Sequence, residues 1–571
     1  MLAPTATRPH YAPGVPAEID VPGIPLSRLL DEAARRWPTR IALEFLGAEL
    51  TYAQVAEAVS RAAGMLEEAG VRRGDPVALV LPNCPQHVIA FYAVLRLGAV
   101  VAEHNPLAPA AELQAQLSGH GARVVIAWEK TLGQVVPGGD LRGRKVFAVD
   151  LTAALPWSSR LLLKLPLAAA REKRDALRGP VPAGVLSWDR AVAQASPLPA
   201  HYAEADPSDL AALLHTGGTT GTPKAVALSH RNLVANALQG IAWVTGLKEG
   251  GETILAVLPF FHAFGLTLCL TFAVRLGATQ VILPKFDVDL VLAAMKRHPV
   301  TFFPGVPPMF DRLAEAAEAR KADLRSIRFS ISGAMALDRG IAERWERATG
   351  GLIVEGYGMT ECSPVVMGNP LSAARRPGTL GLPFPSTEYK VVDPEHPETE
   401  VPPGQVGELI VRGPQVFQGY YGQPEETAKV MLPGGWLRTG DLVHVDDGFV
   451  VLSDRIKEMI ISGGFKVFPS QVEEAVRTMP EVKDVAVVGV PEQGKESVVA
   501  VLVLAAGVQR VALDRVRAWA AQHVSPYAVP RQIAFVKELP RSMLGKVLRR
   551  VVREQLLHAP APRVVEQPPA A

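Results

Sequence analysis

Cysteine is scarce in this chain, which has three among its 571 residues: Cys84, Cys269 and Cys362. Their number is odd, and their spacing matches neither a metal site nor a redox motif. A disulfide-stapled secreted protein is therefore excluded, and we expect a reducing, cytoplasmic location.

An excess of charge of either sign is also missing. Lysine and arginine number 59 against 57 for aspartate and glutamate, so the net charge is +2. Because a dedicated nucleic-acid surface needs a basic excess, we expect no nucleic-acid partner.

An uninterrupted membrane-spanning run is absent as well. Residues 253–274 contain no charged side chain when His262 is neutral, and a run of that length can cross a bilayer. Pro259 and Gly265 interrupt it, which favours a buried strand, a loop and a helix. Residues 1–11 lack the apolar core of a secretory signal, so none is expected.

What the chain does contain is a regular alternation of apolar patterns. Its length calls for more than one core, and strand and helix patterns alternate from residue 41 to residue 127, which indicates an α/β domain with largely parallel sheets. Beyond residue 454 the pattern restarts, with helices expected at 469–478 and 511–523 and strands at 484–490, 498–504 and 532–537. These elements suffice for a compact α+β domain of about 100 residues.

A glycine- and threonine-rich loop is the strongest chemical signal. The apolar strand at 211–214 leads into Thr216–Lys224, which reads TGGTTGTPK. Its glycines let backbone N–H groups approach an anion, while its threonines and lysine add donors and positive charge. It is not a Walker A loop, because Pro223 precedes Lys224 and Ala225 follows it. The alternative is a flexible surface loop without a ligand.

Four further motifs follow in order, and each has an ordinary explanation when taken alone. They are Glu355–Glu361, Trp436–Leu442, Asp454–Ile460 with Gly463–Val467 after it, and Leu539–Lys546. Taken in that order, they could be a turn with a capping threonine, a turn with an Asx hydrogen bond, a solvated charged face and a loop with a surface lysine.

Taken together, the five motifs resemble the adenylate-forming superfamily over about residues 30–556. The chain is most similar to bacterial long-chain fatty-acid–CoA ligases, which have counterparts of Pro259–His262, Gly381–Pro383 and Pro414–Val416. One departure is Gly217, where the family more often has serine or threonine. It removes one phosphate donor and leaves Thr216, Thr219 and Thr220 in place.

The resemblance implies a fold and a division of the chain. We expect an α/β protein with a large multi-subdomain N-terminal adenylation domain and a small, mobile α+β C-terminal domain. The predicted parts are an irregular segment at 1–25, the large domain at 26–454, a hinge at 455–457 that includes Lys457, the small domain at 458–556, and a disordered tail at 557–571.

The resemblance also implies roles for individual residues. The ATP phosphates would be held by Thr216, Gly217, Gly218, Thr219, Thr220, Gly221 and Lys224. Adenine would be held by Gly333, Ala334, Met335, Glu355, Gly356 and Tyr357, with Gly358 and Thr360 in the same nucleotide motif. Ribose would bind Asp441 and Arg455, and Mg²⁺ would be placed by Thr216 and Glu361. Catalysis would involve Lys546 at the reacting carboxylate, together with Thr216, Glu361 and His262. The pantetheine of coenzyme A would pass Gly463, Gly464 and Phe465.

The implied reaction uses ATP, Mg²⁺ and coenzyme A to convert a carboxylic acid, expected to be a medium- or long-chain fatty acid, into its acyl-CoA. A nonribosomal adenylation domain is the nearest alternative, but Phe260–Phe264 lacks the aspartate that such domains use to pair an amino group. An acyl-AMP ligase, an enzyme that loads a carrier-protein thiol, luciferase-like oxygenation and a nucleotide-binding module without catalysis also stay open. Chain length, and the choice between aliphatic and aromatic acids, cannot be read from the sequence.

Residues 156–180 differ from the rest of the chain. Trp157 and five leucines are interleaved with Arg160, Lys164, Arg171, Lys173 and Arg174, and Pro166 interrupts any single helix. A basic, leucine-rich segment with a tryptophan can lie in a membrane interface, at the inner face of the membrane here. The alternative is a surface segment packed on its own domain. Whether the chain forms a homodimer is left open.

Overall fold

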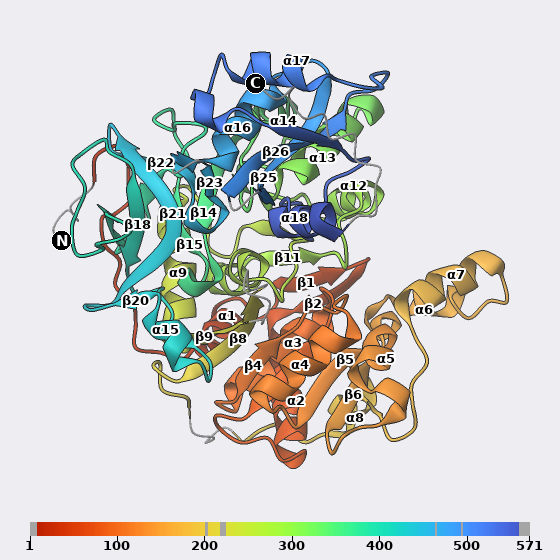
Figure 1. Cartoon of the computed structure of the whole chain (residues 1–571). Coiled ribbons are helices and arrows are strands. Elements are labelled where there is room, and N and C mark those ends of the chain that lie inside the picture. The colour runs from red at the N-terminus through yellow and green to blue at the C-terminus, as the bar shows by residue number, and fades with distance from the viewer. Residues whose placement is uncertain (1–7, 200–203, 217–223, 463–464, 493–494, 559–571) are drawn as a thin grey trace. The chain divides into compact units, whose positions relative to one another are not determined.

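The computed structural model describes residues 8–199, 204–216, 224–462, 465–492 and 495–558. Internal contacts divide the chain into two compact units (Figure 1). Unit 1 comprises Met1–Glu388 and Arg412–Gly435, and unit 2 comprises Tyr389–Val411 and Trp436–Ala571. The chain therefore leaves unit 1, starts unit 2, returns to unit 1 and then completes unit 2.

The first sheet of unit 1 is mostly parallel, as the alternating pattern predicts. Its strands in spatial order are β19 (Gly419–Tyr420), β9 (Lys224–Ser229), β8 (Leu210–Thr216), β4 (Val100–Glu103), β3 (Pro76–Val80), β5 (Val124–Trp128), β6 (Lys145–Val149) and β7 (Leu186–Ser187). The pairs from β8 to β7 are parallel, whereas β9 is antiparallel to both of its neighbours.

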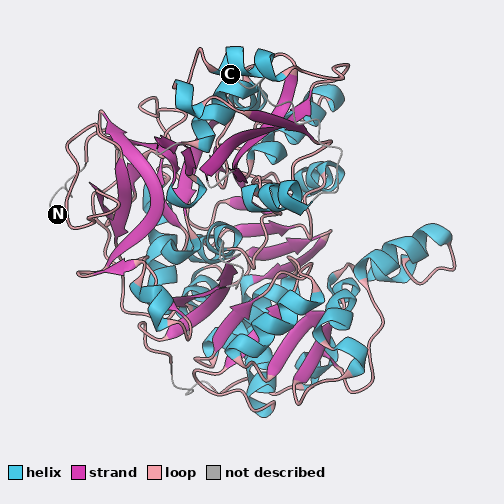
Figure 2. Ribbon diagram, viewed as in Figure 1, coloured by secondary structure: helices cyan, strands magenta, loops and turns pink. Residues whose placement is uncertain are grey.

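Helices alternate with these strands (Figure 2). They are α1 (Ser27–Arg36), α2 (Tyr52–Glu68), α3 (Pro85–Arg96), α4 (Ala110–His120), α5 (Leu132–Val135), α6 (Trp157–Leu162), α7 (Ala168–Leu177), α8 (Trp188–Gln194) and α9 (His230–Trp243). Leu113 and Leu117 of α4 pack with Val125 of β5 in one buried cluster. Capping boxes fix where two of these helices begin, with Thr51 and Gln54 at α2 and Ser229 and Asn232 at α9.

The second sheet of unit 1 has a parallel centre. Its order is β16 (Leu382–Pro383), β15 (Val365–Gly368), β14 (Leu352–Gly358), β13 (Phe329–Ser332), β12 (Phe302–Gly305), β10 (Thr253–Ala256), β11 (Thr279–Ile282), β1 (Ile41–Phe45) and β2 (Ala48–Thr51). Its accompanying helices are α12 (Val288–Arg297), α13 (Pro307–Arg320) and α14 (Arg339–Thr349), and α15 (Pro424–Ala428) and β20 (Met431–Leu432) complete the elements of unit 1. Phe303, Phe310 and Trp345 form the aromatic centre of the core between this sheet and its helices.

The uncharged run at 253–274 folds as expected. It forms β10, a loop, α10 (Ala263–Gly265), a π-helical segment (Leu266–Thr271) and the start of α11 (Phe272–Leu276). All residues of the π-helical segment are buried. In the described part of the chain, no helix combines the length and apolarity that a bilayer crossing requires.

Unit 2 contains two β structures with separate elements. The first includes β17 (Glu388–Val392), β18 (Gly407–Arg412), β21 (Trp436–Asp446) and β22 (Phe449–Arg455), in which β21 is antiparallel to both β18 and β22. The second is the expected α+β fold, formed by β23 (Ile460–Ser462), β24 (Phe465–Val467), α16 (Pro469–Arg477), β25 (Val482–Glu492), β26 (Lys495–Leu504), α17 (Leu513–Ala520), β27 (Gln532–Phe535) and α18 (Arg549–His558). A short 3₁₀ helix, η6 (Ile456–Glu458), connects the two, so the predicted hinge at 455–457 lies within unit 2.

Candidate active site

The phosphate loop closes a hairpin between β8 and β9. Thr216, the last residue of β8, pairs across the ladder with Lys224, the first residue of β9. The Thr216 hydroxyl donates to the carbonyl of Lys224 over 3.4 Å. Residues 217–223, among them Gly217, Gly218, Thr219, Thr220 and Gly221, lie outside the described residues.

Lys224 already has partners, which the sequence pattern did not reveal. Its ammonium group pairs with the carboxylate of Glu426 and lies 4.7 Å from the centre of the Tyr420 ring. Hydrogen bonds from Lys224 and Lys429 lower the pKa of Glu426 to about 2, so this carboxylate is ionised at neutral pH. A separation of 202 residues leaves no local signal for such a pair.

Glu361 is a nearly buried carboxylate with a single neutral donor. Its side chain accepts a hydrogen bond of 2.8 Å from the Tyr420 hydroxyl, and burial together with Glu361 raises the pKa of that tyrosine. No lysine or arginine of the described chain makes an ion pair with Glu361. A carboxylate oxygen that no ion pair neutralises is a hard ligand of the kind that fits Mg²⁺. The short helix that carries it, Thr360–Cys362, packs on β9.

The residues assigned to adenine lie at the ends of two neighbouring parallel strands. Ser332 of β13 pairs with Glu355 of β14, so Gly333 and Gly356 occupy the same edge of the sheet. A Cβ at Gly333 would lie 2.9 Å from the Phe264 ring, and Ala334 has a positive φ of 66°. Only a minimal side chain lets the backbone approach an aromatic neighbour so closely, and that requirement explains the glycine.

His262 is neutral at physiological pH. Burial lowers its pKa to about 4. Its Nδ1 accepts the backbone N–H of Phe264 over 3.2 Å, so its single ring proton is on Nε2. In this arrangement Nε2 of His262 can donate a hydrogen bond, and Nδ1 is already engaged as an acceptor. Met335, Tyr357, Gly358 and Thr360 lie in the same unit as Gly333 and Glu361.

Unit 2 carries the residues assigned to ribose. Asp441 of β21 pairs with Arg455 of β22 across the ladder, and the guanidinium of Arg455 lies 3.0 Å from the carboxylate. The carboxylate of Asp441 is buried, whereas Arg455 is more than one-third exposed. The backbone N–H of Asp441 donates to the hydroxyl of Thr439, which fixes the turn that places the carboxylate.

Lys546 lies at the end of a tight turn. The N–H of Ser542 donates to the carbonyl of Lys546, and the N–H of Lys546 donates back to the Ser542 hydroxyl. Gly545 supplies the left-handed φ of 81° that closes this turn. In the described part of the chain the Lys546 ammonium has no ion-pair partner, whereas nearby Arg541 is paired with Asp484. Lys546 is therefore available to a carboxylate.

Phe465, assigned to the pantetheine path, is exposed on unit 2. Its ring stacks on Tyr527 with centroids 4.7 Å apart and an interplanar angle of 12°. Both rings remain open to solvent, with exposures of 55% and 37%. Gly463 and Gly464 lie outside the described residues. Two exposed stacked aromatics form a surface on which a thin apolar group can lie.

The chain is similar to known proteins along most of its length. The AMP-binding enzyme family matches residues 30–421, and the AMP-binding enzyme C-terminal domain matches residues 471–546. The chain is 36% identical over 550 residues to a long-chain-fatty-acid–CoA ligase of Bacillus subtilis, covering 96% of this chain and 97% of that one. It is 34% identical to 4-coumarate–CoA ligase 1 of Oryza sativa, with 90% and 88% covered. The ATP-bound crystal structure of MatB from Rhodopseudomonas palustris matches with a TM-score of 0.79 and 29% identity, over 93% of this chain and 99% of that one.

Proposed function

The chain belongs to the AMP-binding enzyme family, and on this premise we propose that it is a ligase that converts a long-chain fatty acid into its acyl-CoA. ATP and coenzyme A are its co-substrates. The observation that carries the proposal is the similarity along nearly the whole length to a curated long-chain-fatty-acid–CoA ligase. The apolar residues expected near the acyl site offer no charged partner to a polar substrate: Phe260, Phe264, Leu266 and Val306 are buried, and Phe261 is partly buried.

In the first half-reaction a carboxylate oxygen attacks the α-phosphorus of ATP, and pyrophosphate leaves. The product is acyl-AMP, a mixed anhydride. The transition state spreads negative charge over the phosphoryl oxygens, so positioned donors supply most of the catalysis. Lys546 is the donor assigned to the carboxylate and the α-phosphate. Thr216 and Glu361 would hold Mg²⁺, which when bound neutralises phosphate charge.

In the second half-reaction the thiol of coenzyme A attacks the acyl carbon, and AMP leaves. Because His262 holds its proton on Nε2, it would donate a hydrogen bond and not accept the thiol proton. Lys546 and Phe465 both belong to unit 2, yet they are assigned to different half-reactions. A rotation about residues 455–457 between the two steps would account for this division.

The test measures ATP–pyrophosphate exchange and thioester formation separately, for acids of graded length and for free amino acids. Each additional buried CH₂ should favour binding by up to about 0.8 kcal/mol until the pocket is filled. Exchange without thioester would indicate an acyl-AMP ligase. A preference for 4-coumarate would indicate an aromatic acid, and turnover of an amino acid as fast as that of a fatty acid would refute the proposal.

We further propose that α6 and α7 attach the enzyme to anionic membrane. The two helices project from the first sheet of unit 1 (Figure 1), and Trp157, Leu162 and Leu167 are 74%, 61% and 59% exposed. Residues 157–178 carry six basic and two acidic side chains. Exposed apolar side chains beside an excess of positive charge suit an interface with anionic lipid.

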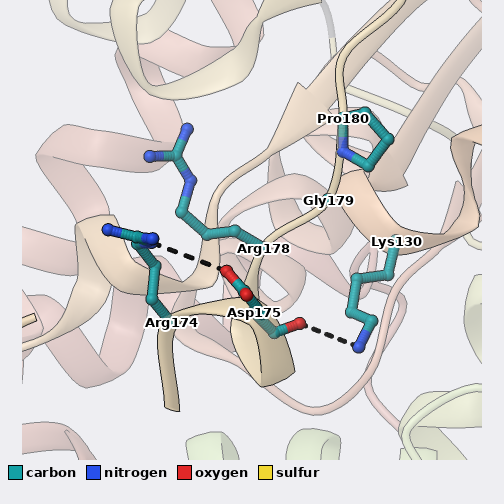
Figure 3. A pocket seen from close by; sticks show the side chains of 6 residues that line it. All are labelled: Lys130, Arg174, Asp175, Arg178, Gly179 and Pro180. Carbon is teal, nitrogen blue, oxygen red and sulfur yellow. Dashed lines mark hydrogen bonds and ion pairs between the residues drawn. The ribbon is translucent and has the colours of Figure 1, made fainter. Parts of the chain in front are cut away.

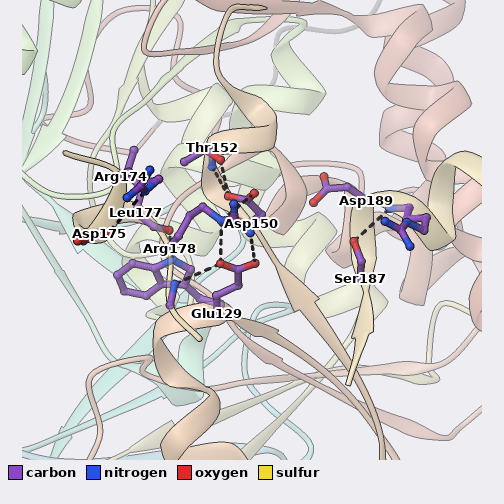
Figure 4. Close-up of polar contacts among 12 residues, drawn as sticks. Glu129, Asp150, Thr152, Arg174, Asp175, Leu177, Arg178, Ser187 and Asp189 are labelled. Atoms are coloured by element: carbon purple, nitrogen blue, oxygen red, sulfur yellow. Dashed lines mark hydrogen bonds and ion pairs between the residues drawn. The ribbon is translucent and has the colours of Figure 1, made fainter. Parts of the chain in front are cut away.

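Ion pairs hold the C-terminal end of α7 to the first sheet of unit 1. Arg178 forms ion pairs with Glu129 and Asp150, both at 3.1 Å, which ties the end of α7 to the sheet (Figure 4). Beside it lies an open hollow of about 500 Å³, in which Lys130 donates to the carbonyl of Asp175 (Figure 3). The cations here are engaged by acidic or carbonyl oxygens, so this hollow is better explained as an anchor for α7 than as a ligand site.

A charge-reversal variant tests the membrane proposal. Arg160, Lys164 and Arg171 are replaced together by glutamate, and sedimentation with phosphatidylserine and phosphatidylcholine vesicles is compared. Binding to the anionic vesicles should fall, while turnover of a soluble short acid should not change. The matched control replaces Arg320, Lys321 and Arg325, which are exposed elsewhere on unit 1. Equal sedimentation of both variants with wild type would favour a segment without a lipid partner.

A further inference from the structure

Three histidines that belong to none of the motifs meet beside the strand that ends at Thr216. His104 follows β4, His120 ends α4, and His215 is the next-to-last residue of β8. One ring nitrogen from each lies within 4.8 Å of those of the other two. His104 and His120 are buried and His215 is partly buried, and the ring of His104 stacks on that of His215 with centroids 4.6 Å apart.

The hydrogen bonds around the cluster fix where each ring carries its proton. The N–H of Ala122 donates to Nδ1 of His120, so His120 carries its proton on Nε2 and donates it to Nε2 of His104 over 3.0 Å. His104 therefore carries its proton on Nδ1 and donates it to the amide oxygen of Gln116 over 2.9 Å. The amide nitrogen of Gln116 in turn donates to Glu112.

Nδ1 of His215 donates a hydrogen bond to an oxygen, as Nδ1 of His104 does. Its Nδ1 lies 3.0 Å from the carbonyl oxygen of Glu103 and must donate to it, which leaves a lone pair on Nε2. That nitrogen has no hydrogen-bond partner among the described residues. An imidazole whose Nδ1 donates to a carbonyl or amide oxygen, with Nε2 free to bind, is the usual arrangement of a histidine that ligates a metal.

We propose that His104, His120 and His215 bind one Zn²⁺ through their Nε2 atoms, with a water molecule as the fourth ligand. Three imidazoles and a water make a tetrahedral zinc site, and Zn–N bonds of about 2.0–2.1 Å place the ligand nitrogens roughly 3.3 Å apart. The two nitrogens of His104 and His120 already lie 3.0 Å apart. Burial lowers the pKa of each ring, that of His120 to about 3, so all three are neutral and able to ligate.

Zinc binding requires one rearrangement. When zinc takes the Nε2 lone pair of His120, the single proton of that ring moves to Nδ1, and the N–H of Ala122 loses its acceptor. The guanidinium of Arg144 also acts against a cation beside His120, since it already disfavours protonation of that ring. The site should therefore bind zinc less tightly than one whose three rings are all prearranged.

The site would act on the strand that leads into the phosphate loop. His215 immediately precedes Thr216, and neighbouring side chains of a strand point to opposite faces. The ion would thus tie β8 to β4 and α4 on the face away from Thr216. It would hold the start of the loop without entering the nucleotide site, whichever acid the enzyme activates.

The experiment uses the full-length protein purified from zinc-supplemented cells. Its zinc content is measured, the metal is removed with a chelator, and Co²⁺ is titrated while its visible absorption and the thermal unfolding midpoint are recorded. The test variant is His215→Asn, because an asparagine amide can still donate to the Glu103 carbonyl but offers no Nε2. The control is His298→Gln, a histidine outside the cluster whose Nε2 contacts Glu49.

We expect about one zinc per chain, a tetrahedral cobalt spectrum and a rise in the unfolding midpoint on adding zinc, for both wild type and the control. His215→Asn should weaken metal binding by more than the roughly 10- to 100-fold that follows loss of an outer partner. Absence of zinc together with an unchanged midpoint would overturn the proposal and leave a self-satisfied hydrogen-bonded cluster. Equal metal binding by His215→Asn and wild type would overturn it as well.

Discussion

Two histidines of unit 1 and one arginine of unit 2, all largely buried, differ in how they meet the cost of burying charge. Burial lowers the pKa of His230 and His262 to about 4. Arg549 of unit 2 instead pairs with Glu473 and Glu458, and these partners raise its pKa. Burial thus keeps these two histidines of unit 1 uncharged, whereas the charge of Arg549 in unit 2 is balanced by two carboxylates.

The difference bears on function because the two units divide the site residues. Thr216, Glu361 and His262 lie in unit 1, and Asp441, Arg455 and Lys546 lie in unit 2. Phe465 and Lys546, which are assigned to two different steps, both follow residue 457, and the ion pairs of Arg549 with Glu458 and Glu473 would keep this part of unit 2 together during a rotation about residues 455–457. Four experiments test the contrast, from the largest expected effect to the smallest.

Replacing Arg549 by methionine should have the largest effect. The change leaves Glu473 and Glu458 without their cation, and breaking a buried pair typically costs about 3–5 kcal/mol of stability. Hydrogen exchange should show lost protection in β25 and β26 but not in β3 and β5. Arg550→Met is the control, since its exposed pair with Glu554 is worth at most about 1 kcal/mol. Equal loss of protection in both units would show that the stabilising effect of the Arg549 ion pairs is not confined to unit 2.

Replacing Lys546 by alanine should separate the half-reactions. Adenylation should fall by roughly 10²–10³ or more, as for removal of one transition-state donor. Conversion of supplied acyl-AMP and coenzyme A to thioester should persist. Lys537→Ala, an exposed lysine of the same unit, should affect neither step. Equal loss of both steps in Lys546→Ala would contradict the assignment.

Replacing Lys457 by proline should have the reverse effect. Lys457 is exposed and lies in η6, outside the β22 ladder, so the fold should tolerate the change. Proline fixes φ and restricts the preceding residue. Adenylation should persist while thioester formation falls by about 10², as expected for a misplaced reacting group. The control is Lys457→Ala. If thioester formation is equally fast in Lys457→Pro and Lys457→Ala, the prediction that residues 455–457 act as a hinge is contradicted.

The smallest expected effect concerns pH. His230 is fully buried with a folded pKa of about 4, so the unfolded chain binds the extra proton between about pH 4 and 6.5 and stability falls as pH drops. From pH 7.5 to pH 5 this histidine should lower the free energy of unfolding of unit 1 by about 2 kcal/mol. In His230→Asn this pH-dependent decrease of about 2 kcal/mol should be absent, while the amide oxygen can still accept the Leu26 N–H. If wild type and His230→Asn lose the same stability between pH 7.5 and pH 5, the lowered pKa of His230 is contradicted.

Much of the fold follows from local patterns in the sequence. The β1–β2 hairpin, the helix α2 with its Thr51 cap, and the small α+β fold after residue 454 all come from periodicity and turn residues acting over short distances. The helix break near Pro166 also appears as predicted, between α6 and α7. Family membership and fold class are confirmed by the comparisons.

The partners of the site residues could not be predicted in this way. Tyr420 reaches Glu361 across 59 residues, and Glu426 reaches Lys224 across 202. Such contacts depend on β19 joining the edge of the first sheet, and a two-residue strand has no periodic signature. The histidine cluster was missed for the same reason, since β4, α4 and β8 bring together residues up to 111 positions apart. The roles assigned to the site residues and the hinge stay predictions.

The interrupted order of the two units has a consequence for synthesis on the ribosome. Unit 1 needs residues 412–435 for its edge strand β19 and for Glu426, so it cannot be complete until residue 435 has emerged. By then residues 389–411 have also emerged, but β18 still lacks β21, its partner from the later part of the chain. Domains generally fold as units as the chain is made, from the N-terminal end. Nascent unit 1 should therefore mature first, while the edge of β18 that later pairs with β21 is still unpaired. A pause in translation shortly after residue 435 should leave that edge exposed to chaperones or to aggregation.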